Sequence, residues 1–400
     1  MLRLTMVTMK KATQARLIFL FYLLANVTLV GCIAYFGWTR TWSAVFVPTL
    51  SPPFADMRFI QGAVISSDEG LNPQISNPHD PWHHSLNYPL VWVKIGQALN
   101  LPDELRFNQL CGLVVMGFVS ICGYILFRFP SFGLLTCLFS TATLLSIERG
   151  NVDLIIFSLV FVFALVFPRT LSPIPLLVAT MLKLYPVFLL GTLLIKRQLI
   201  LFFTSLIFAL AIFAYMSDQL PLIYSNTPSS TWISYGFPSL ALHFWAYNLP
   251  PWMLASAIIV ICSAILMMAV YFRKIEGCLL LDGFDASLFL AGASIYVGTF
   301  IISSNYDYRL IFLIFCVPFV EKNRFPLGTL SVILIIVAMN ELILPTWLRV
   351  PGLAIVLVAK VVIFVVLSAY LAAFIPTIFE GSLKKVLAEK RKRIEVETVE

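Results

Sequence analysis

Four charged side chains are placed where they could do chemistry, because each lies beside or within a long apolar stretch. Asp56 follows the first such stretch, Arg149 lies between two others, Lys183 stands near the middle of another, and Arg309 follows one more. Charges at these positions are costly in a bilayer, so they usually line a cavity or pair with one another. A carboxylate there can accept a proton as a general base, and Arg or Lys can bind phosphate oxygens. We therefore predict a site with Asp56 as its base and three cations that hold an anionic group.

Three polar motifs contain the cations and extend the predicted site. Glu148-Arg149-Gly150-Asn151-Val152-Asp153 ends one apolar stretch, Lys183-Leu184-Tyr185-Pro186 interrupts another, and Asn305-Tyr306-Asp307-Tyr308-Arg309 follows a third. Their polar side chains, together with one close to the candidate base, are predicted to contact the substrate: Arg58, Asn151, Asp153, Tyr185, Asn305 and Asp307.

These charges also have a purely structural interpretation. Arg149 could pair with Glu148 or Asp153, and Asp307 with Arg309, simply to close helix ends. The lysine of the second motif has no acidic neighbour in sequence and lies beside a proline. The functional interpretation is therefore strongest for that lysine.

The polar stretch around Asp56 contains other groups that could do chemistry. Asp68-Glu69 is an alternative base, although it comes later in the stretch. The segment His79-Asp80-Pro81-Trp82-His83-His84 could hold a metal, but its spacing matches no zinc signature. We predict no metal and no other cofactor, and the chain has no nucleotide-binding motif.

Membrane helices must position all of these residues. Of the 400 residues, 60% are hydrophobic and only 12% are charged, which is about half the charged fraction of a soluble domain. We predict an all-α polytopic integral membrane protein with a single domain over residues 1–380. It would have about ten full crossings, the first at Leu17–Phe36, and a charged tail at 381–400.

Two loops and one broken helix interrupt the pattern of crossings. Residues 38–106 are predicted to form a first external loop with short interfacial helices, and residues 217–250 a second loop. Between Arg169 and Lys196 the apolar residues are too few for two crossings, which need about forty. Two half-helices that meet at Lys183 to Pro186 would fit, since proline breaks the backbone pairing there.

The basic residues predict the orientation of the chain. Four precede the first apolar stretch and six lie between Lys384 and Arg393. This distribution places both termini in the cytoplasm and the predicted site on the extracytoplasmic face. It also accounts for the net charge of +7 without a nucleic-acid partner.

The predicted chemistry suits a lipid phosphate. A site that is cationic and open to the membrane can grip the phosphate of an anionic lipid headgroup. With a polyprenyl-phosphate sugar as donor, the carboxylate would accept the proton of the acceptor hydroxyl and the cations would stabilise the leaving phosphate. Direct displacement would invert the anomeric centre without a covalent enzyme intermediate.

The motifs resemble those of glycosyltransferase family 87. Arg149-Gly150-Asn151-Val152-Asp153, the Lys183 to Pro186 motif about thirty residues later, Asp56 and the Asn305 to Arg309 motif carry the resemblance, which spans residues 17–325. The family comprises membrane enzymes of the GT-C fold, including polyprenyl-phosphate-mannose-dependent mannosyltransferases. The resemblance implies a lipid-phosphate-linked donor, an Asp base in the first loop and transfer outside the cytoplasm. Many GT-C enzymes have two adjacent acids in that loop, but Met57 follows Asp56 here.

The sequence thus predicts an inverting glycosyltransferase of a bacterial cytoplasmic (inner) membrane. Its donor would be a polyprenyl-phosphate sugar carrying mannose, another hexose or the pentose arabinofuranose, and its acceptor a glycolipid or glycan within reach of the membrane lipids. Two other classes stay open. A multi-pass transporter for a lipid-linked or anionic substrate would also explain a broken helix with a buried lysine. A non-catalytic partner in envelope assembly is the other alternative.

Overall fold

A computed structural model describes the chain except for residues 1, 231, 276–282, 323–326, 344–348 and 375–400. In the described part, helices form nearly all of the regular structure and a single pair of short strands forms the rest. The composition and these apolar helices identify the chain as an all-α polytopic membrane protein. The predicted fold class is confirmed at this level.

The first half of the chain contains ten α-helices and one 3₁₀-helix: α1 (Leu2–Phe36), α2 (Trp38–Ala44), α3 (Ala55–Asp68), α4 (Val91–Ala98), α5 (Glu104–Arg128), α6 (Phe132–Leu138), α7 (Thr141–Glu148), α8 (Asp153–Val166), α9 (Pro173–Leu182), η1 (Tyr185–Leu189) and α10 (Leu190–Ile195). Helices α3 and α4 are the short helices predicted within residues 38–106. The second half holds α11 (Leu199–Tyr215), α12 (Leu220–Asn226), β1 (Ser234–Tyr235), α13 (Phe237–Ala246), α14 (Pro251–Lys274), α15 (Phe284–Ile302), β2 (Asn305–Tyr306), η2 (Asp307–Phe315), α16 (Val317–Lys322), α17 (Gly328–Ala338), η3 (Glu341–Ile343) and α18 (Arg349–Ala373).

Only some of the apolar stretches form helices of spanning length. Among the described residues five helices are long and apolar enough to cross a membrane, or six if α11 and α12, which meet at a 79° bend, count as one. Further apolar helices have 10–17 residues, about 15–26 Å in length against a hydrocarbon core of about 30 Å. About ten full crossings are therefore not seen as full-length helices. Several of the short helices end where polar motifs begin, which brings those motifs inside the protein.

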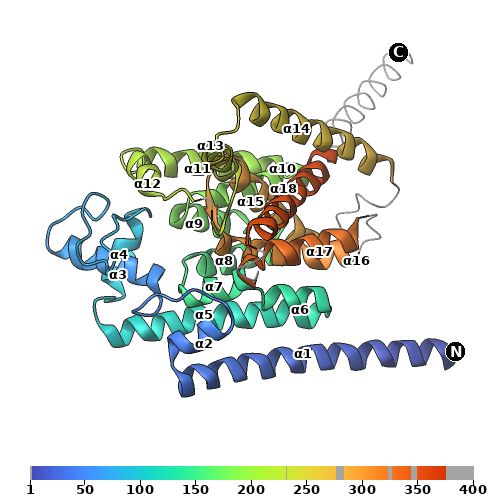
Figure 1. The fold of residues 1–400 in the computed structure, drawn as a ribbon, viewed down its shortest axis with the longest axis horizontal. Helices are drawn as coiled ribbons and strands as arrows, with labels where there is room; N and C mark the ends of the chain where they lie inside the picture. Colours follow the sequence, from blue (N-terminus) through green and yellow to red (C-terminus); the bar gives the residue numbers. More distant parts are fainter. Residues whose placement is uncertain (1, 231, 276–282, 323–326, 344–348, 375–400) are drawn as a thin grey trace, which may run out of the picture.

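The long helices lie around a common interior. Figure 1 shows α1 and α5 side by side along one flank, α14 along the opposite flank, and α3 and α4 together at one end. The start of α1 and the ends of α5 and α14 lie at the other end. Arg128 ends α5, and Arg273 and Lys274 end α14. The basic helix ends therefore gather at the end of the molecule where α1 begins.

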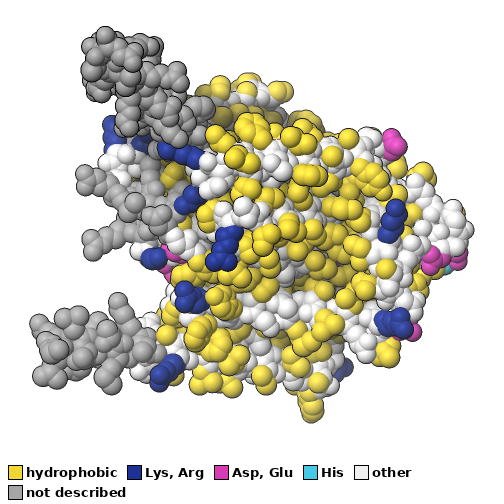
Figure 2. Space-filling view, turned by 180° about the vertical axis from the view of Figure 1, so that it is seen from behind, with side chains coloured by type: hydrophobic (Ala, Val, Ile, Leu, Met, Phe, Trp, Pro, Cys, Tyr) yellow, Lys and Arg dark blue, Asp and Glu magenta, His cyan; other side chains and the backbone are white. Residues whose placement is uncertain are grey.

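The outer surface of the bundle is apolar. Figure 2 shows a broad hydrophobic surface, with Lys and Arg concentrated toward the left and most of the visible Asp and Glu at the right margin. Side chains such as Val27 of α1, Ile207 of α11 and Ile259 of α14 are exposed. Exposed aliphatic side chains on helices of spanning length indicate contact with lipid.

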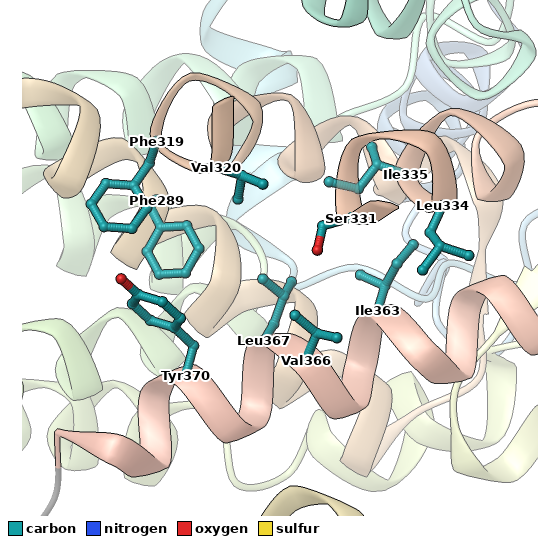
Figure 3. A pocket seen from close by; sticks show the side chains of 10 residues that line it. All are labelled: Phe289, Phe319, Val320, Ser331, Leu334, Ile335, Ile363, Val366, Leu367 and Tyr370. Carbon is teal, nitrogen blue, oxygen red and sulfur yellow. The ribbon is translucent and has the colours of Figure 1, made fainter. Parts of the chain in front are cut away.

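The interior on the C-terminal side is a packed aromatic and aliphatic core. Phe289 of α15 stacks on Phe319 of α16 with ring centroids 4.5 Å apart, and Tyr370 of α18 meets Phe289 edge-on at 4.9 Å (Figure 3). The cavity beside them, about 10 Å³, has room for about one water. This core holds α15 and α18 rigidly around the segment that contains β2 and η2.

A short strand pair joins the second predicted loop to the Asn305 to Arg309 motif. In the antiparallel pair of β1 and β2, Ser234 lies opposite Tyr306 and Tyr235 opposite Asn305. The second predicted loop, 217–250, is thereby fixed to the Asn305 to Arg309 motif.

The predicted helix break at Lys183 is confirmed. Helix α9 ends at Leu182, Lys183 has an extended backbone with φ −157° and ψ 114°, and η1 and α10 follow. Pro186 lies at the start of η1, where its missing N–H breaks no helical hydrogen bond. The two halves therefore meet at the lysine, as the sequence predicted.

Candidate functional site

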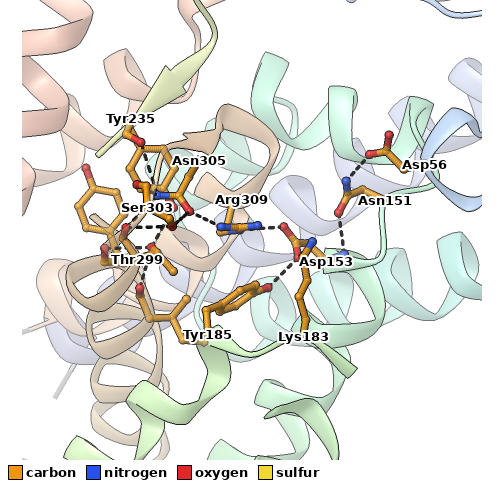
Figure 4. A network of polar contacts seen from close by, with 12 residues as sticks. Asp56, Asn151, Asp153, Lys183, Tyr185, Tyr235, Thr299, Ser303, Asn305 and Arg309 are labelled. Atoms are coloured by element: carbon orange, nitrogen blue, oxygen red, sulfur yellow. Dashed lines mark hydrogen bonds and ion pairs between the residues drawn. The ribbon is translucent and has the colours of Figure 1, made fainter. Parts of the chain in front are cut away.

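Asp56 is held in the first turn of α3 and is joined to the loop between α7 and α8. Its backbone N–H donates to the carbonyl oxygen of Arg149 at 2.9 Å, and its carboxylate accepts a hydrogen bond from Asn151 Nδ2 (Figure 4). Phe54 precedes α3 with a left-handed φ of 62°. The candidate base and the Glu148 to Asp153 motif therefore form one structure, although Asp56 and Asn151 are 95 positions apart in the chain.

Asn151 connects two acidic residues. Its Oδ1 accepts a hydrogen bond from the backbone N–H of Asp153 at 2.7 Å, while its Nδ2 donates to Asp56. Gly150 precedes it with a φ of +55°, and a Cβ at Gly150 would lie 3.0 Å from Cβ of Phe54. The close approach and the left-handed backbone both favour glycine at this position.

Asp153 is the centre of a buried ionic cluster. Lys183 Nζ and the Tyr185 hydroxyl donate to its Oδ1 at 2.6 and 2.7 Å, and Arg309 Nε donates to its Oδ2 at 3.2 Å. Figure 4 shows the three donors converging on the carboxylate from separate elements. Three motifs that are far apart in sequence are thus joined through one acid, and two of the predicted cations share it.

The first loop supports the end of α9 that presents Lys183. Trp92 of α4 donates its indole N–H to the carbonyl oxygen of Leu182 at 2.8 Å, which satisfies one of the carbonyl groups that a helix C-terminus leaves unpaired. The lysine Nζ also lies 5.0 Å from the ring centroid of Tyr88. The first loop therefore holds both the backbone before Lys183, through Trp92, and the lysine ammonium group, through Tyr88.

Arg309 is held by the motif in which it occurs. Its Nη1 donates to Asn305 Oδ1, and Asn305 in turn donates to the carbonyl oxygen of Thr299 at 2.9 Å. The guanidinium lies 4.5 Å from the ring centroid of Tyr185, a cation–π geometry. Asn305 therefore orients the arginine, and it also lines the pocket beside the cluster.

Arg149 has a partner of its own. Its Nε lies 3.2 Å from Glu148 Oε2, which is one of the two pairings that the structural interpretation anticipated. Glu148 also accepts hydrogen bonds from the backbone N–H of Leu50 at 3.0 Å and from Trp38 Nε1 at 3.3 Å. Within the described residues, the buried Nη1 of Arg149 has no hydrogen-bond partner. Arg149 therefore stabilises the loop between α7 and α8, and its Nη1 remains able to donate a hydrogen bond.

A pocket of about 310 Å³ adjoins the ionic cluster. Lys183 and Arg309 form part of its polar wall. Its apolar lining comes from η1, α11, α12 and α15, through Val187, Phe188, Phe213, Ile223 and Ile302. Ile302 is 64% exposed on the outer surface. The pocket thus joins a charged interior to the apolar exterior of the protein.

Three tyrosines line this pocket on the side toward Asp56. They are Tyr88, Tyr306 and Tyr308. Burial raises the pKa of Tyr88, and the nearby negative charge of Asp56 raises it further. The rings of Tyr306 and Tyr308 lie 5.7 Å apart. The site therefore presents neutral hydroxyl groups and aromatic faces close to the candidate base.

The surroundings of Asp56 strengthen it as a base. Burial raises the pKa of its carboxyl above the ordinary value of 3.8, while the positive charge of Arg149 and the hydrogen bond from Asn151 lower it. Protein atoms enclose the group on most sides, but its side chain keeps partial exposure. A raised pKa makes a carboxylate a better proton acceptor as long as it stays ionised.

Two predicted site residues lie elsewhere. Asp307 forms hydrogen bonds through both carboxylate oxygens to Lys360 Nζ, at 2.7 and 2.8 Å, and does not pair with Arg309. Arg58 pairs with Glu104 at 2.5 Å. Asp307 is at the start of η2 and faces α18, whereas the arginine two positions later faces the opposite way. The predictions that Asp307 and Arg58 contact the substrate have no support from these contacts.

The alternative base lies at the far end of α3. Asp68 is twelve positions after Asp56 on the same helix, about 18 Å along its axis. Asp68 accepts a hydrogen bond from Gln97 at 2.6 Å, and Glu69 pairs with His79 at 2.8 Å. Neither acid is near the ionic cluster, so Asp56 is the better candidate.

The histidine segment forms local pairs. His84 lies 3.5 Å from Asp80, and the carboxylate of Asp80 also accepts from two backbone N–H groups of the same loop. Across the described part of the chain, no three His, Cys, Asp or Glu side chains come together in a way that could hold a metal ion. These contacts are those of a loop that stabilises its own turns.

Several residues that shape the site were not identified from the sequence. Tyr88 and Trp92 carry no pattern that separates them from interfacial aromatic residues. Lys360 did carry a signal, because a lone lysine within an apolar stretch usually has a buried partner. Its partners are Glu341 and Asp307, the acid that was predicted to contact the substrate.

Comparison of the chain with protein-family models, with curated proteins and with solved structures finds no match.

Proposed function

We propose that the protein is an inverting glycosyltransferase that uses a polyprenyl-phosphate sugar as donor, with Asp56 as general base. One observation carries the proposal. Asp56 is bridged by Asn151 to the cluster of Lys183, Asp153 and Arg309, and that cluster forms part of the wall of a pocket with an apolar side. Two fixed cations therefore line an apolar cavity, and the proton acceptor, which is not itself among the lining residues, is joined to them through Asn151.

The charge of the cluster suits a phosphodiester. Lys183 and Arg309 share the single carboxylate of Asp153, so the three groups carry one net positive charge. A sugar linked to a lipid through a phosphodiester carries one negative charge. Fixed cations in a buried site stabilise the negative charge that grows on the leaving phosphate. The cluster would thus bind the donor and stabilise the departing group more strongly.

The apolar wall suits the lipid part of the donor. Phe213 of α11 and Ile302 of α15 line the pocket, and the second of these is largely exposed on the outer surface. A prenyl chain could leave the pocket between these helices and continue in the bilayer. The phosphate would remain at the buried cations, as an anionic headgroup requires.

The tyrosines would contact the sugar. Aromatic faces and neutral hydroxyl donors suit a sugar ring that carries hydroxyl groups. Tyr88, Tyr306 and Tyr308 offer these, since all three line the pocket and lie close enough to Asp56 to interact with its charge. The anomeric carbon would then lie between the phosphate and the base.

The transfer is a single displacement. The acceptor hydroxyl oxygen forms a bond to the anomeric carbon as the bond from that carbon to the phosphate oxygen breaks. The electron pair of the broken bond stays on the polyprenyl phosphate, and the hydroxyl proton passes to Asp56 and then to water. Attack from the side opposite the phosphate inverts the anomeric centre, and no residue becomes covalently modified.

The orientation and the resemblance complete the proposal. The basic helix ends gather at the end opposite α3 and α4, so the positive-inside rule would place the site on the extracytoplasmic face of a bacterial cytoplasmic membrane. The motifs resemble glycosyltransferase family 87, which favours mannose as the sugar and a glycolipid or glycan as the acceptor.

The test is transfer by the purified protein in lipid nanodiscs. A panel of radiolabelled polyprenyl-phosphate sugars is offered with glycolipid or glycan acceptors, and inversion is checked in the product. The Asp56→Asn variant should lose transfer while it still retains donor lipid, and Asp68→Asn, which alters the other end of α3, should transfer normally. Full activity of Asp56→Asn would remove this residue from the mechanism. Sugar uptake into proteoliposomes without any transfer would favour a transporter instead.

A further inference from the structure

A second cavity lies beside the first helix. It is a groove of about 700 Å³ between α1, α2 and the α6–α7 segment. Its lining is almost entirely apolar and comprises Phe21, Leu24, Ala25, Thr28, Leu29, Cys32, Phe36, Arg40, Thr41, Ala44, Val45, Phe139 and Leu144. None of the residues assigned above to the candidate site lines it.

The groove follows the axis of α1. The lining residues of this helix recur every three or four positions from Phe21 to Phe36, so they form one stripe. Fifteen residues of helix correspond to about 22 Å. All of these residues belong to the span Thr13–Phe36. An apolar groove of this length that runs parallel to a membrane helix can hold a hydrocarbon chain along the helix; we call it the slot.

A cation lies at one end of the slot. Arg40 of α2 lines the groove four residues after the span ends, and its side chain is exposed. Within the ranges that the structure describes, no acidic side chain pairs with it. Four residues past the end of a membrane helix is the depth of the lipid headgroups, where arginine attracts anionic lipids.

We infer that this groove binds one anionic phospholipid, with its phosphate at Arg40 and one acyl chain along α1. The position of the charge, at the headgroup end of an otherwise apolar slot, matches an amphiphile with a negative head. A zwitterionic phospholipid carries the same phosphate but no net negative charge, so the arginine would attract it less strongly. The site is separate from the pocket proposed for the donor and does not depend on glycosyl transfer.

The bound lipid would support the frame of the candidate site. Trp38 lies two residues before Arg40 in α2, donates to Glu148 and packs against Phe54 with ring centroids 4.8 Å apart. Phe54 leads directly into the turn that carries Asp56. A lipid that holds α2 in place therefore also steadies the residues behind the candidate base.

The first test measures the headgroup. Protein is reconstituted in nanodiscs that contain equal amounts of phosphatidylglycerol and phosphatidylcholine with the same chains, and native mass spectrometry then counts the lipids that stay bound. The wild type should retain one phosphatidylglycerol per chain, and Arg40→Gln should retain it about fivefold less well, the effect of one basic residue at a membrane surface. Arg106→Gln is the matched control, because Arg106 is also exposed and lies in the first turn of α5, away from the groove.

The second test measures the acyl-chain slot. Ala25→Phe places a ring inside the groove and should displace the retained lipid, whereas Val27→Phe adds the same ring on the outer face of α1, where Val27 is 70% exposed. If the wild type and Arg40→Gln each retained phosphatidylglycerol and phosphatidylcholine equally well, the bound lipid would be ordinary boundary lipid. That result would overturn the inference. Retention unaffected by Ala25→Phe, or a lipid-free dimer of the wild type, would also overturn it. These readouts do not use activity, so they remain valid if glycosyl transfer is disproved.

Discussion

The protein contains two buried lysine clusters that differ in charge and in access. In the first, Lys183 and Arg309 share the carboxylate of Asp153 beside a pocket of about 310 Å³. In the second, Lys360 contacts both Asp307, at 2.7 Å, and Glu341, at 2.5 Å. The lysine of the second cluster is 1% exposed, and its members are absent from the lining of that pocket. The first cluster has an excess of cations and the second an excess of acids.

The difference indicates what each cluster can do. A cluster with one net positive charge at a pocket wall can receive an anion, and its own carboxylate keeps the cations in place until the anion arrives. A cluster with two acids around one lysine has no charge to offer an anionic ligand. It also ties together β1, η2, η3 and α18, because Lys360 Nζ donates to the carbonyl oxygen of Ser234 at 3.1 Å and Ile233 N–H donates to Glu341. The first cluster is suited to binding, and the second to holding the fold together.

The strongest test of this comparison neutralises one acid at each site: Asp56, which is joined to the first cluster, and Asp307, which belongs to the second. Asp56→Asn should reduce sugar transfer by roughly 10²–10⁴-fold, the usual contribution of a general base. Asp307→Asn should leave kcat within a few fold, since Lys360 keeps Glu341 as its partner. Initial rates on the radiolabelled donor measure both. A comparable loss of kcat in the two variants would show that the clusters are not separate in function.

The second prediction compares the two lysines in stability. Lys360→Met leaves two acids without their cation and should destabilise the protein by about 3–5 kcal/mol, as when one partner of a buried ion pair is removed. Lys183→Met should cost less, because Asp153 still pairs with Arg309 and Tyr185. Thermal unfolding in one detergent gives the order of the two variants. The opposite order would contradict the structural role of the second cluster.

The third prediction compares the clusters in binding. Lys183→Met should weaken retention of polyprenyl phosphate by about tenfold or more, because a hydrogen bond to a charged group contributes about 1.5–3 kcal/mol. The KM for the acceptor should change little. Glu341→Gln is the matched variant of the other cluster and should leave donor affinity unchanged. An unaltered donor affinity in Lys183→Met would count against a phosphate at this lysine.

The smallest expected effect concerns pH. Burial raises the pKa of Asp56 above 3.8, so its base form is lost as the pH falls through that raised value. The acid limb of the kcat/KM profile should therefore lie above pH 3.8. The Asn151 hydrogen bond lowers this pKa, so Asn151→Ala should move the limb to higher pH, while Gln97→Ala near the other end of α3 should not. A limb that stays in place in Asn151→Ala would show that another group titrates.

A good part of the local structure followed from the sequence. The composition indicated a membrane protein, Pro186 and Lys183 marked a helix break, and short helices were expected in the stretch 38–106 that contains Asp56. These features depend on residues that are neighbours in the chain. Local backbone geometry determines where a helix breaks, and the free energy of transferring side chains out of water determines which segments are apolar enough for a membrane. Short-range patterns are sufficient to predict them.

The partners of the charges could be decided only by the tertiary structure. Arg309 reaches Asp153 across 156 positions, and Lys360 reaches Asp307 across 53. Asp307 and Arg309 are two residues apart, yet they face different clusters, because the β1–β2 pair and η2 direct one toward α18 and the other toward α8. The energy of an ion pair depends on the distance between its atoms and on burial, and neither is determined by separation along the chain. The sequence therefore showed which residues carry charge inside the membrane protein, and the packing of distant helices determined which charges are shared and which remain available to a ligand.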